Sequence, residues 1–313
     1  MTTASLPVAQ PFMLDANPGQ RFCLYHAPAS RPRGAILYVH PFAEEMNKTR
    51  RLAAQQSRAF AASGYGVLQT DLYGCGDSSG DSGDASCAIW LSDLALACAW
   101  LNEHCPGPQI FWGLRLGALL ALAYACSLAQ ASEAPTPAAL IFWQPALHGR
   151  SHLAQFLRMR QTARMLAGAT GDIGSMRAAP GIGTAADDPG LEHGSKAIEV
   201  GGYRLSPALL RELTALEAGR LRPPCPVHWL HVGAAQGSPD SGAPTAARQA
   251  GDNAAPGRCN PGLPAPVHLQ LERWRSDGVA VHMKALQGAP FWAGTDIADC
   301  PALLAATSAL ELP

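Results

Sequence analysis

Residues 110–125 constrain the fold of this chain more than any other stretch. An apolar run, Ile110 to Trp112, leads into Gly113-Leu114-Arg115-Leu116-Gly117, and a helix-forming run rich in Ala and Leu follows. The two glycines have no Cβ, so a sharp turn can bring the chain close to neighbouring backbone at this point. The pattern predicts a strand, a strained turn and a helix, with residue 115 raised over the carboxyl edge of a sheet.

This arrangement resembles the nucleophile elbow of the α/β-hydrolases, in which the middle residue of G-x-S-x-G is the catalytic serine. In this chain the middle residue is Arg115. A guanidinium stays protonated and cannot carry an acyl group. The motif therefore predicts the hydrolase scaffold and excludes acyl-serine chemistry at its tip.

Two further loops follow predicted strands in the order that this fold requires. HPFAEEMNK (40–48) lies where an α/β-hydrolase supplies a backbone N–H to the oxyanion hole. DLYGCGDSSG (71–80) is similar to the D-x-x-G-x-G-x-S turn of lipase-like and peptidase-like hydrolases. Each signal alone is weak, because a Gly-rich turn after a strand is usually only a turn. Together, in this order and spacing, the three are specific for the fold.

Apolar runs and their periodicity place strands and helices in alternation, which is the pattern of a doubly wound, mostly parallel sheet. The 313 residues are 48% hydrophobic, so one large core can form, and we expect a single α/β-hydrolase-like domain over residues 1–313. Strands are predicted at 21–25, 35–39, 66–70, 110–112, 139–143, 227–232 and 279–285, and helices at 48–62, 87–104, 116–129, 265–277 and 302–310.

Two stretches interrupt the alternation. Residues 145–224 lie where hydrolases of this fold often carry a lid or cap, and we expect a helical insertion there, with an amphipathic segment at 152–166 and a second at 207–216. Within it, 167–194 has too few large apolar residues to pack. Residues 233–266 are rich in Gly, Ala, Pro and Ser and are expected to form a flexible loop.

The amphipathic segment of the insertion has two interpretations. Arg158, Arg160 and Arg164 alternate with apolar residues at helical spacing. A helix packed over the sheet with a solvated basic face accounts for this pattern. A lid that admits an amphiphilic or anionic ligand, such as a lipid-linked or acyl-bearing intermediate, accounts for it as well.

Composition excludes several other functions. A net charge of −1 does not favour nucleic-acid binding. The nine cysteines contain no C-x-x-C pair, and His148, His152 and His193 are too irregularly spaced for a metal site, so neither metal nor cofactor is expected. The first residues lack the charged and apolar regions of a signal peptide, and no apolar run reaches a membrane span, so a cytoplasmic location is expected. The oligomeric state stays open.

The other members of a hydrolase triad can be sought by position. The base histidine of this fold follows the last strand, where the chain reads Gly-Ala-Pro-Phe291-Trp292 and offers no histidine. The acid follows the strand at 227–232, where the nearest carboxylate is Asp240, inside the expected flexible loop. His282 could be recruited, although a histidine in a strand is more often a packed or surface residue. With serine and histidine both missing, an ordinary Ser-His-Asp enzyme is disfavoured.

Arg115 needs a carboxylate, because the positive end of the following helix disfavours a cation. Glu44, Glu45 and Asp71 are the candidates that the fold brings near, in the main pocket beneath the insertion. The group is either a structural clasp or an anion-handling site in which a glutamate activates water. The candidate catalytic residues are therefore Arg115, Glu44, Glu45 and Asp71, and the candidate substrate-binding residues are His40, Phe42, Leu114, Leu116, Gln144, Phe291 and Trp292.

A narrower resemblance rests on longer strings. HPFAEEMNKTRR, DLYGCGDSSGD, FWGLRLGA, WQPALHGRSHLAQFLRMR and GAPFWAGTDIADCPALL resemble the second of two α/β-hydrolase-like families associated with the exosortase A system, a bacterial protein-sorting and exopolysaccharide-linked locus. The resemblance implies a hydrolase in that pathway, of the ester or thioester type. The alternative is a catalytically inactive hydrolase fold that binds a ligand or a partner in the same pathway.

Overall fold

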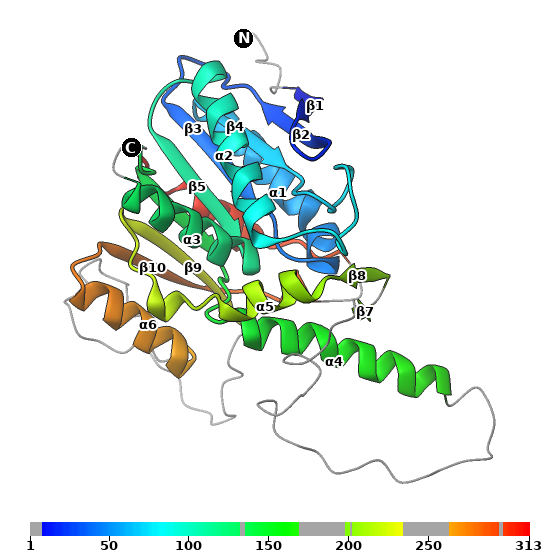
Figure 1. Cartoon of the computed structure of the whole chain (residues 1–313). Coiled ribbons are helices and arrows are strands. Elements are labelled where there is room, and N and C mark those ends of the chain that lie inside the picture. The colour runs from blue at the N-terminus through cyan, green and yellow to red at the C-terminus, as the bar shows by residue number, and fades with distance from the viewer. Residues whose placement is uncertain (1–7, 132–134, 169–197, 201, 234–262, 294–296) are drawn as a thin grey trace, which may run out of the picture.

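One eight-stranded sheet organises the described part of the chain (Figure 1). The structure is a computed structural model that describes residues 8–131, 135–168, 198–200, 202–233, 263–293 and 297–313. Across the sheet the strands are β1 (Ala9–Asp15), β2 (Gln20–His26), β4 (Tyr65–Thr70), β3 (Gly34–Val39), β5 (Gln109–Leu114), β6 (Ala139–Trp143), β9 (Val227–Gly233) and β10 (Val281–Gln287).

Neighbouring strands from β4 to β10 pair in parallel, and β2 pairs antiparallel with both β1 and β4. The predicted mostly parallel sheet is therefore confirmed. β5 lies in the middle of the order, which places Arg115 at the carboxyl end of a central strand, as expected. The sequence-based prediction missed β1, because this edge strand is half exposed and contains Pro11.

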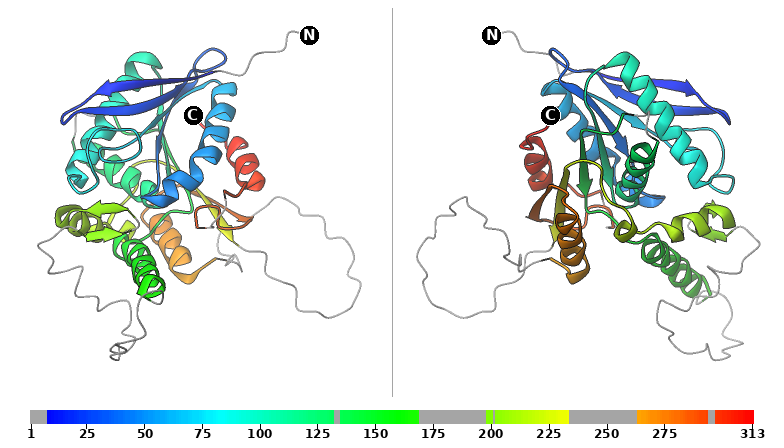
Figure 2. Two further views of the ribbon diagram at one scale, coloured as in Figure 1. Left: turned by 90° about the vertical axis from the view of Figure 1, so that its right-hand side faces the viewer. Right: turned by 60° about the vertical axis from the view of Figure 1, so that its left-hand side comes forward.

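Helices cover both faces of the sheet (Figure 2). α2 (Cys87–His104), α3 (Leu116–Gln130) and α6 (Ala265–Ser276) contribute to the apolar cluster on one face, and α1 (Glu44–Ala62) and α7 (Pro301–Ser308) to the cluster on the other. Alternate strand residues divide between the faces: Leu37 and Phe111 point to the first, Ile36 and Trp112 to the second. The central strands are buried on both faces, as a parallel sheet requires.

The expected insertion between β6 and β9 contains α4 (Gly149–Gly168), the hairpin of β7 (Ile198–Val200) and β8 (Tyr203–Leu205), α5 (Pro207–Ala215) and the short helix η1 (Ala218–Arg220). These elements lie together beyond the end of β5 that leads into α3 (Figure 1). Residues 169–197 and 234–262, which carry most of the two stretches expected to be flexible, lie outside the described residues. Among the described helices, none has the length and apolar character needed to cross a membrane.

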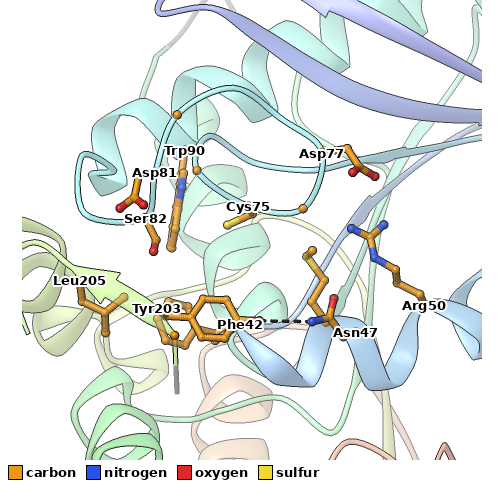
Figure 3. Close-up of a pocket in the computed structure, with 16 residues that line it drawn as sticks. Phe42, Asn47, Arg50, Cys75, Asp77, Asp81, Ser82, Trp90, Tyr203 and Leu205 are labelled. Carbon is orange, nitrogen blue, oxygen red and sulfur yellow. Dashed lines mark hydrogen bonds between the residues drawn. The ribbon is translucent and has the colours of Figure 1, made fainter. Parts of the chain in front are cut away.

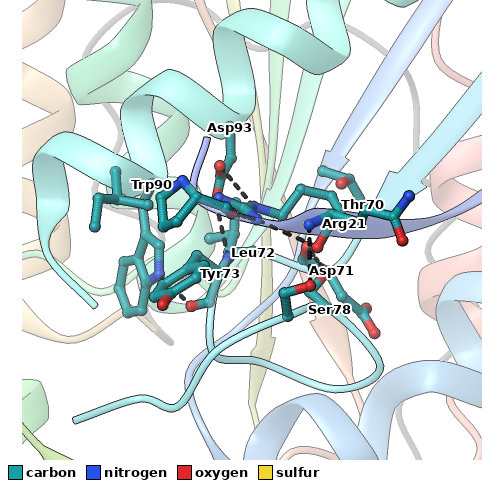
Figure 4. A network of polar contacts seen from close by, with 12 residues as sticks. Arg21, Thr70, Asp71, Leu72, Tyr73, Ser78, Trp90 and Asp93 are labelled. Carbon is teal, nitrogen blue, oxygen red and sulfur yellow. Dashed lines mark hydrogen bonds and ion pairs between the residues drawn. The ribbon is translucent and has the colours of Figure 1, made fainter. Parts of the chain in front are cut away.

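A buried ion pair fixes the loop between β4 and α2 (Figure 4). Arg21 Nε lies 2.7 Å from Asp93 Oδ1, and the two side chains are only 1% and 3% exposed. The other oxygen of Asp93 accepts a hydrogen bond of 2.8 Å from the Tyr73 backbone N–H. The Arg21 guanidinium also lies over the Tyr73 ring, 4.8 Å from its centroid. One carboxylate thus connects β2, α2 and the loop that follows β4.

Removing one partner of this pair should destabilise the fold strongly, because a buried charge is then left uncompensated. We expect Asp93→Asn to lower the free energy of unfolding by about 3–5 kcal/mol in urea titrations. Asp81→Asn is the matched control: Asp81 is 53% exposed and pairs with Arg204, which is 55% exposed. Its loss should stay below about 1 kcal/mol. Equal losses in the two variants would show that the buried pair does not anchor the loop.

Candidate active site at the strand-turn-helix elbow

The turn after β5 has the geometry that its two glycines predict. A Cβ added to Gly117 would lie 2.3 Å from the carbonyl oxygens of both Val39 and His40, and one added to Gly113 would lie 2.4 Å from the Ala118 Cα. The tip residue Arg115 has φ 56° and ψ −119°, a conformation that is rare and strained for a side-chain-bearing residue. The flanking Leu114 and Leu116 are buried in the core.

Arg115 extends from this tip over the carboxyl edge of the sheet. Its Nε donates a hydrogen bond of 3.1 Å to Glu45 Oε1, and one terminal nitrogen donates a longer one of 3.4 Å to Gln155 Oε1 on α4. The guanidinium carbon lies 5.2 Å from the centroid of the Trp292 ring, within the range of a cation–π contact. The expected charge-assisted bond of Arg115 is thus confirmed, with Glu45 as its partner.

A histidine of the insertion completes this group. His152 Nε2 on α4 lies 3.6 Å from Glu45 Oε2. Burial, reinforced by the positive charge of Arg115, lowers the pKa of His152 to about 3, so the imidazole is neutral near pH 7. Burial also raises the pKa of Glu45, while Arg115 opposes that shift. We call Arg115, Glu45 and His152 the elbow cluster.

Sequence reasoning did not assign His152 to the site. One feature of the sequence could have indicated it. His152 and Gln155 are three residues apart, and side chains at i and i+3 share one face of a helix. Both residues contact the Arg115–Glu45 pair. Which face of an insertion helix turns towards the sheet depends on tertiary packing, and the sequence alone did not determine it.

The other candidate acids have different partners. Glu44 Oε2 accepts a hydrogen bond of 3.1 Å from the Tyr203 hydroxyl on β8. Asp71 Oδ2 accepts one of 2.7 Å from Arg50 and one of 3.1 Å from the Asp77 N–H. Of the three acids considered for Arg115, the structure therefore brings only Glu45 into hydrogen-bond contact with it.

Two of the candidate substrate-binding residues hold strand ends in place. His40 Nε2 accepts a hydrogen bond of 3.2 Å from the Leu72 N–H, so Nδ1 carries the proton and donates to the Pro41 carbonyl at 2.8 Å. Gln144, at φ 45°, accepts a bond of 2.7 Å from the Val232 N–H through its side-chain oxygen. These contacts tie β3 to β4 and β6 to β9.

The segment after β10 is aromatic where a triad would need a histidine. Phe291 is 1% exposed, and its ring packs edge-on against Trp143 and Trp292, with centroids 6.4 Å and 5.0 Å away.

His282 lies far from the carboxyl edge of the sheet. It stacks on His228 and lines a cleft with Ala138 and Pro226, at the amino ends of β6 and β9. Asp240 lies outside the described residues. In the described part of the chain, no three His, Cys, Asp or Glu side chains are arranged to hold a metal ion.

A cavity lined by Phe42 is shown in Figure 3, and the Phe42 ring also contacts His152 of the elbow cluster. The volume of the cavity is about 560 Å³, and its walls come from the loop after β3, from α1, from the Gly-rich loop after β4 and from the β7–β8 hairpin. Phe42, Arg50, Asp77, Trp90 and Tyr203 are among the lining residues, but none of the elbow cluster is. The expectation that this cluster lies in the main pocket is therefore wrong. The Phe42 ring accounts for the separate positions of the cavity and the cluster. It packs against Trp90, which lines the cavity, and against His152, which belongs to the cluster.

Strand order, elbow and covering helices together define the α/β-hydrolase fold. Residues 30–178, just under half of the chain, match the family model described as serine aminopeptidase, S33. A search of the curated proteins found no match.

Solved structures agree with this assignment of the fold. Est1E from Butyrivibrio proteoclasticus with ferulic acid bound is similar at a TM-score of 0.55 and 12% identity, over 95% of this chain and 96% of that one. A thermostable carboxyl esterase from Bacillus coagulans in complex with glycerol is similar at a TM-score of 0.53 and 15% identity, over 90% of each chain. The family match and the structural matches together support the α/β-hydrolase superfamily.

The depressed pKa of His152 predicts a pH dependence of stability. Between pH 6.5 and about 3 the unfolded chain binds a proton at this position that the folded protein excludes, so stability falls as the pH is lowered through this window. His152→Gln should remove that component and flatten the plot of unfolding free energy against pH. Urea titrations between pH 4 and 7 measure it.

His104→Gln, at the exposed end of α2, is the control for this experiment and should follow the wild-type slope. A His152→Gln curve parallel to the wild type would contradict the burial of a neutral imidazole in the elbow cluster.

Proposed function

We propose that this protein is a hydrolase of the ester or thioester type that acts without a serine nucleophile. Glu45 serves as the base that activates water, and Arg115 stabilises the negative charge that develops on the substrate. The observation that carries this proposal is the hydrogen bond of Arg115, at the elbow tip, to Glu45, with His152 beside the second carboxylate oxygen. A carboxylate, a guanidinium and a neutral imidazole thus meet where the fold places its reacting group.

The chemistry needs water and the carbonyl group of the substrate. Glu45 removes a proton from water as the oxygen attacks the carbonyl carbon, and the carbonyl oxygen becomes an oxyanion near the Arg115 guanidinium. When the tetrahedral intermediate collapses, the bond to the alcohol or thiol breaks, and that leaving group receives the proton from Glu45. Burial supports the role of Glu45 as base, because it raises the pKa of this carboxyl group. The Oε2 atom of Glu45 is buried and has no hydrogen-bond partner among the described residues, so this oxygen keeps its capacity to accept a proton.

The class of substrate is supported by similarity. The similar protein from Bacillus coagulans is a carboxyl esterase, and Est1E carries ferulic acid. Each is similar to this chain over at least nine-tenths of its length. The link to an exosortase and exopolysaccharide locus rests on the sequence strings that resemble that family. A lipid-linked or acyl-bearing intermediate of the pathway fits a site covered by α4, and it belongs to the same proposal.

A second candidate function is ligand binding without turnover. The observation that favours it is the occupation of both key positions: an ion-paired arginine stands at the elbow tip, and a fully packed Phe291 follows the last strand. In this case Arg115 binds a carboxylate or phosphate of the ligand, and Glu45 holds the guanidinium in place.

Kinetics distinguish the two functions. The wild-type protein should hydrolyse members of a panel of p-nitrophenyl esters and acyl thioesters, and a serine-directed fluorophosphonate probe should not label it. Glu45→Gln should lower kcat by roughly 100-fold or more, the usual contribution of a positioned general base. Glu44→Gln tests the other glutamate and should have a much smaller effect. Glu272→Gln, in an exposed pair with Arg275 on α6, is the matched control.

Fluorophosphonate labelling of the wild type, or full activity in Glu45→Gln, would contradict the proposed mechanism. Absence of turnover across the whole panel would favour the binding function instead. Arg115→Ser provides a hydroxyl at the tip but should not gain serine-type activity, because Phe291 stands where the base histidine is needed. The double variant Arg115→Ser, Phe291→His is the informative comparison. If the single variant alone turned over p-nitrophenyl acetate, His152 would be the base to remove next.

A further inference from the structure

The ring of Phe42 connects the 560 Å³ cavity with the elbow cluster through its contacts. Phe42 lines the cavity, and its ring lies 6.3 Å from that of Trp90, which also lines it. Phe42 lies equally close, at 6.3 Å, to the imidazole of His152, which belongs to the elbow cluster. Phe156 on α4 packs edge-on against Phe42 at 5.2 Å. The phenyl ring therefore lines the cavity and also packs against the imidazole.

We propose that this cavity is the chamber that receives the apolar part of the substrate, and that Phe42 determines which substrates reach the elbow cluster from it. The substrates are esters or thioesters with an apolar group and a polar end. The assignment of a substrate rests on the hydrolytic function proposed above, whereas the separation of the two spaces by Phe42 does not.

The size and lining of the cavity agree with an amphiphilic ligand. Its volume lies within the range of about 300–1,000 Å³ that is usual for ligand pockets. Phe42, Met46, Trp90 and Leu205 provide apolar surface. Asn47, Arg50 and Asp77 lie towards one side in Figure 3 and can hold a polar group.

The backbone beside Phe42 is held in place by its surroundings. Ala43 has φ 51° and ψ −126°, close to the strained conformation of Arg115. Such conformations persist only where the surrounding structure fixes them, and they concentrate at functional sites. The carbonyl of Phe42 also accepts a hydrogen bond of 3.2 Å from the Glu45 N–H, at the start of α1. A rotation of the Phe42 ring is therefore the change that joins the cavity to the cluster.

Tyr203 packs against the same Phe156 ring as Phe42 does. Its hydroxyl donates to Glu44, accepts a bond of 3.2 Å from Asn47, and its ring packs against Phe156 at 6.3 Å. The β7–β8 hairpin is thereby held to α1 and to α4 at the same place. Among the aromatic residues that line the cavity in the described part of the chain, Phe42 is the one whose ring contacts a residue of the elbow cluster.

Chemical modification of His152 tests the separation without relying on activity. Diethyl pyrocarbonate carbethoxylates neutral imidazole, and mass spectrometry of the peptide that carries His152 gives the rate. We expect slow modification in the wild type and an increase of at least roughly tenfold in Phe42→Ala, which corresponds to about 1.4 kcal/mol less free energy for exposing the ring. Phe42→Val, with a smaller loss of packing, should give an intermediate rate and replaces Phe42→Ala if that variant does not fold.

Leu205→Ala is the matched control. Leu205 is a fully buried residue that lines the cavity, but it belongs to β8 and not to the loop that carries Phe42. The substitution enlarges the cavity without opening it to the cluster, so the His152 rate should equal that of the wild type. An unchanged rate in both Phe42 variants, or an equal increase in Leu205→Ala, would overturn the role of Phe42.

Ester chain length tests the substrate assignment. For p-nitrophenyl esters from acetate to decanoate, Phe42→Ala should raise kcat/KM for the long chains relative to acetate by roughly tenfold. Without the ring, a long acyl chain can extend from the cluster into the cavity without the free energy needed to rotate Phe42. If no protein hydrolyses any ester, the proposed function fails while the His152 rates still decide the separation. If esters are hydrolysed but the chain-length profile is the same in all variants, the chamber is not where the apolar group binds.

Discussion

The close approach of α3 to the end of β3 is the constraint on which the rest of this structure depends. Only glycine fits at residue 117, because a Cβ there would collide with two carbonyl oxygens of the neighbouring strand. A Cβ at Gly113 would likewise collide with the backbone at the start of α3. With both glycines in place the turn must be tight, and the residue between them takes a left-handed φ and leaves the sheet edge. The position of Arg115 follows from backbone packing and does not depend on its charge.

The charge of Arg115 then determines what surrounds it. The amino end of α3 is electrostatically unfavourable for a cation, so the guanidinium needs a nearby carboxylate. Glu45 provides it from the first turn of α1, where a negative charge is itself favoured by the helix dipole. Trp292 contacts the guanidinium, and α4 covers it with Gln155 and His152. Two arginine–aspartate pairs, Arg50–Asp71 and Arg21–Asp93, secure the loop after β4.

Much of this scaffold could be predicted from the sequence, because it depends on local pattern. The strand-glycine-helix sequence around Arg115 predicted its position, and apolar runs located the central strands to within a residue or two. Because a cation at this position needs a carboxylate, the sequence limited the partner of Arg115 to three acids. The structure shows that Glu45 is the one that accepts its hydrogen bond. The contacts of His152 with Glu45 and with the Phe42 ring arise from the packing of α4 on the sheet, which has no local signature.

Three neighbouring strands, β3, β5 and β6, are each followed by a side-chain-bearing residue at positive φ: Ala43, Arg115 and Gln144. Each such conformation costs of order 1–3 kcal/mol, and that cost belongs to the backbone whichever side chain is present. The strain at the rim of the sheet is therefore a property of the backbone, and the contacts of the side chains come in addition to it. Exchange of Arg115 for a smaller residue with a Cβ, such as serine, would leave this backbone cost unchanged, while the hydrogen bonds to Glu45 and Gln155 would be lost.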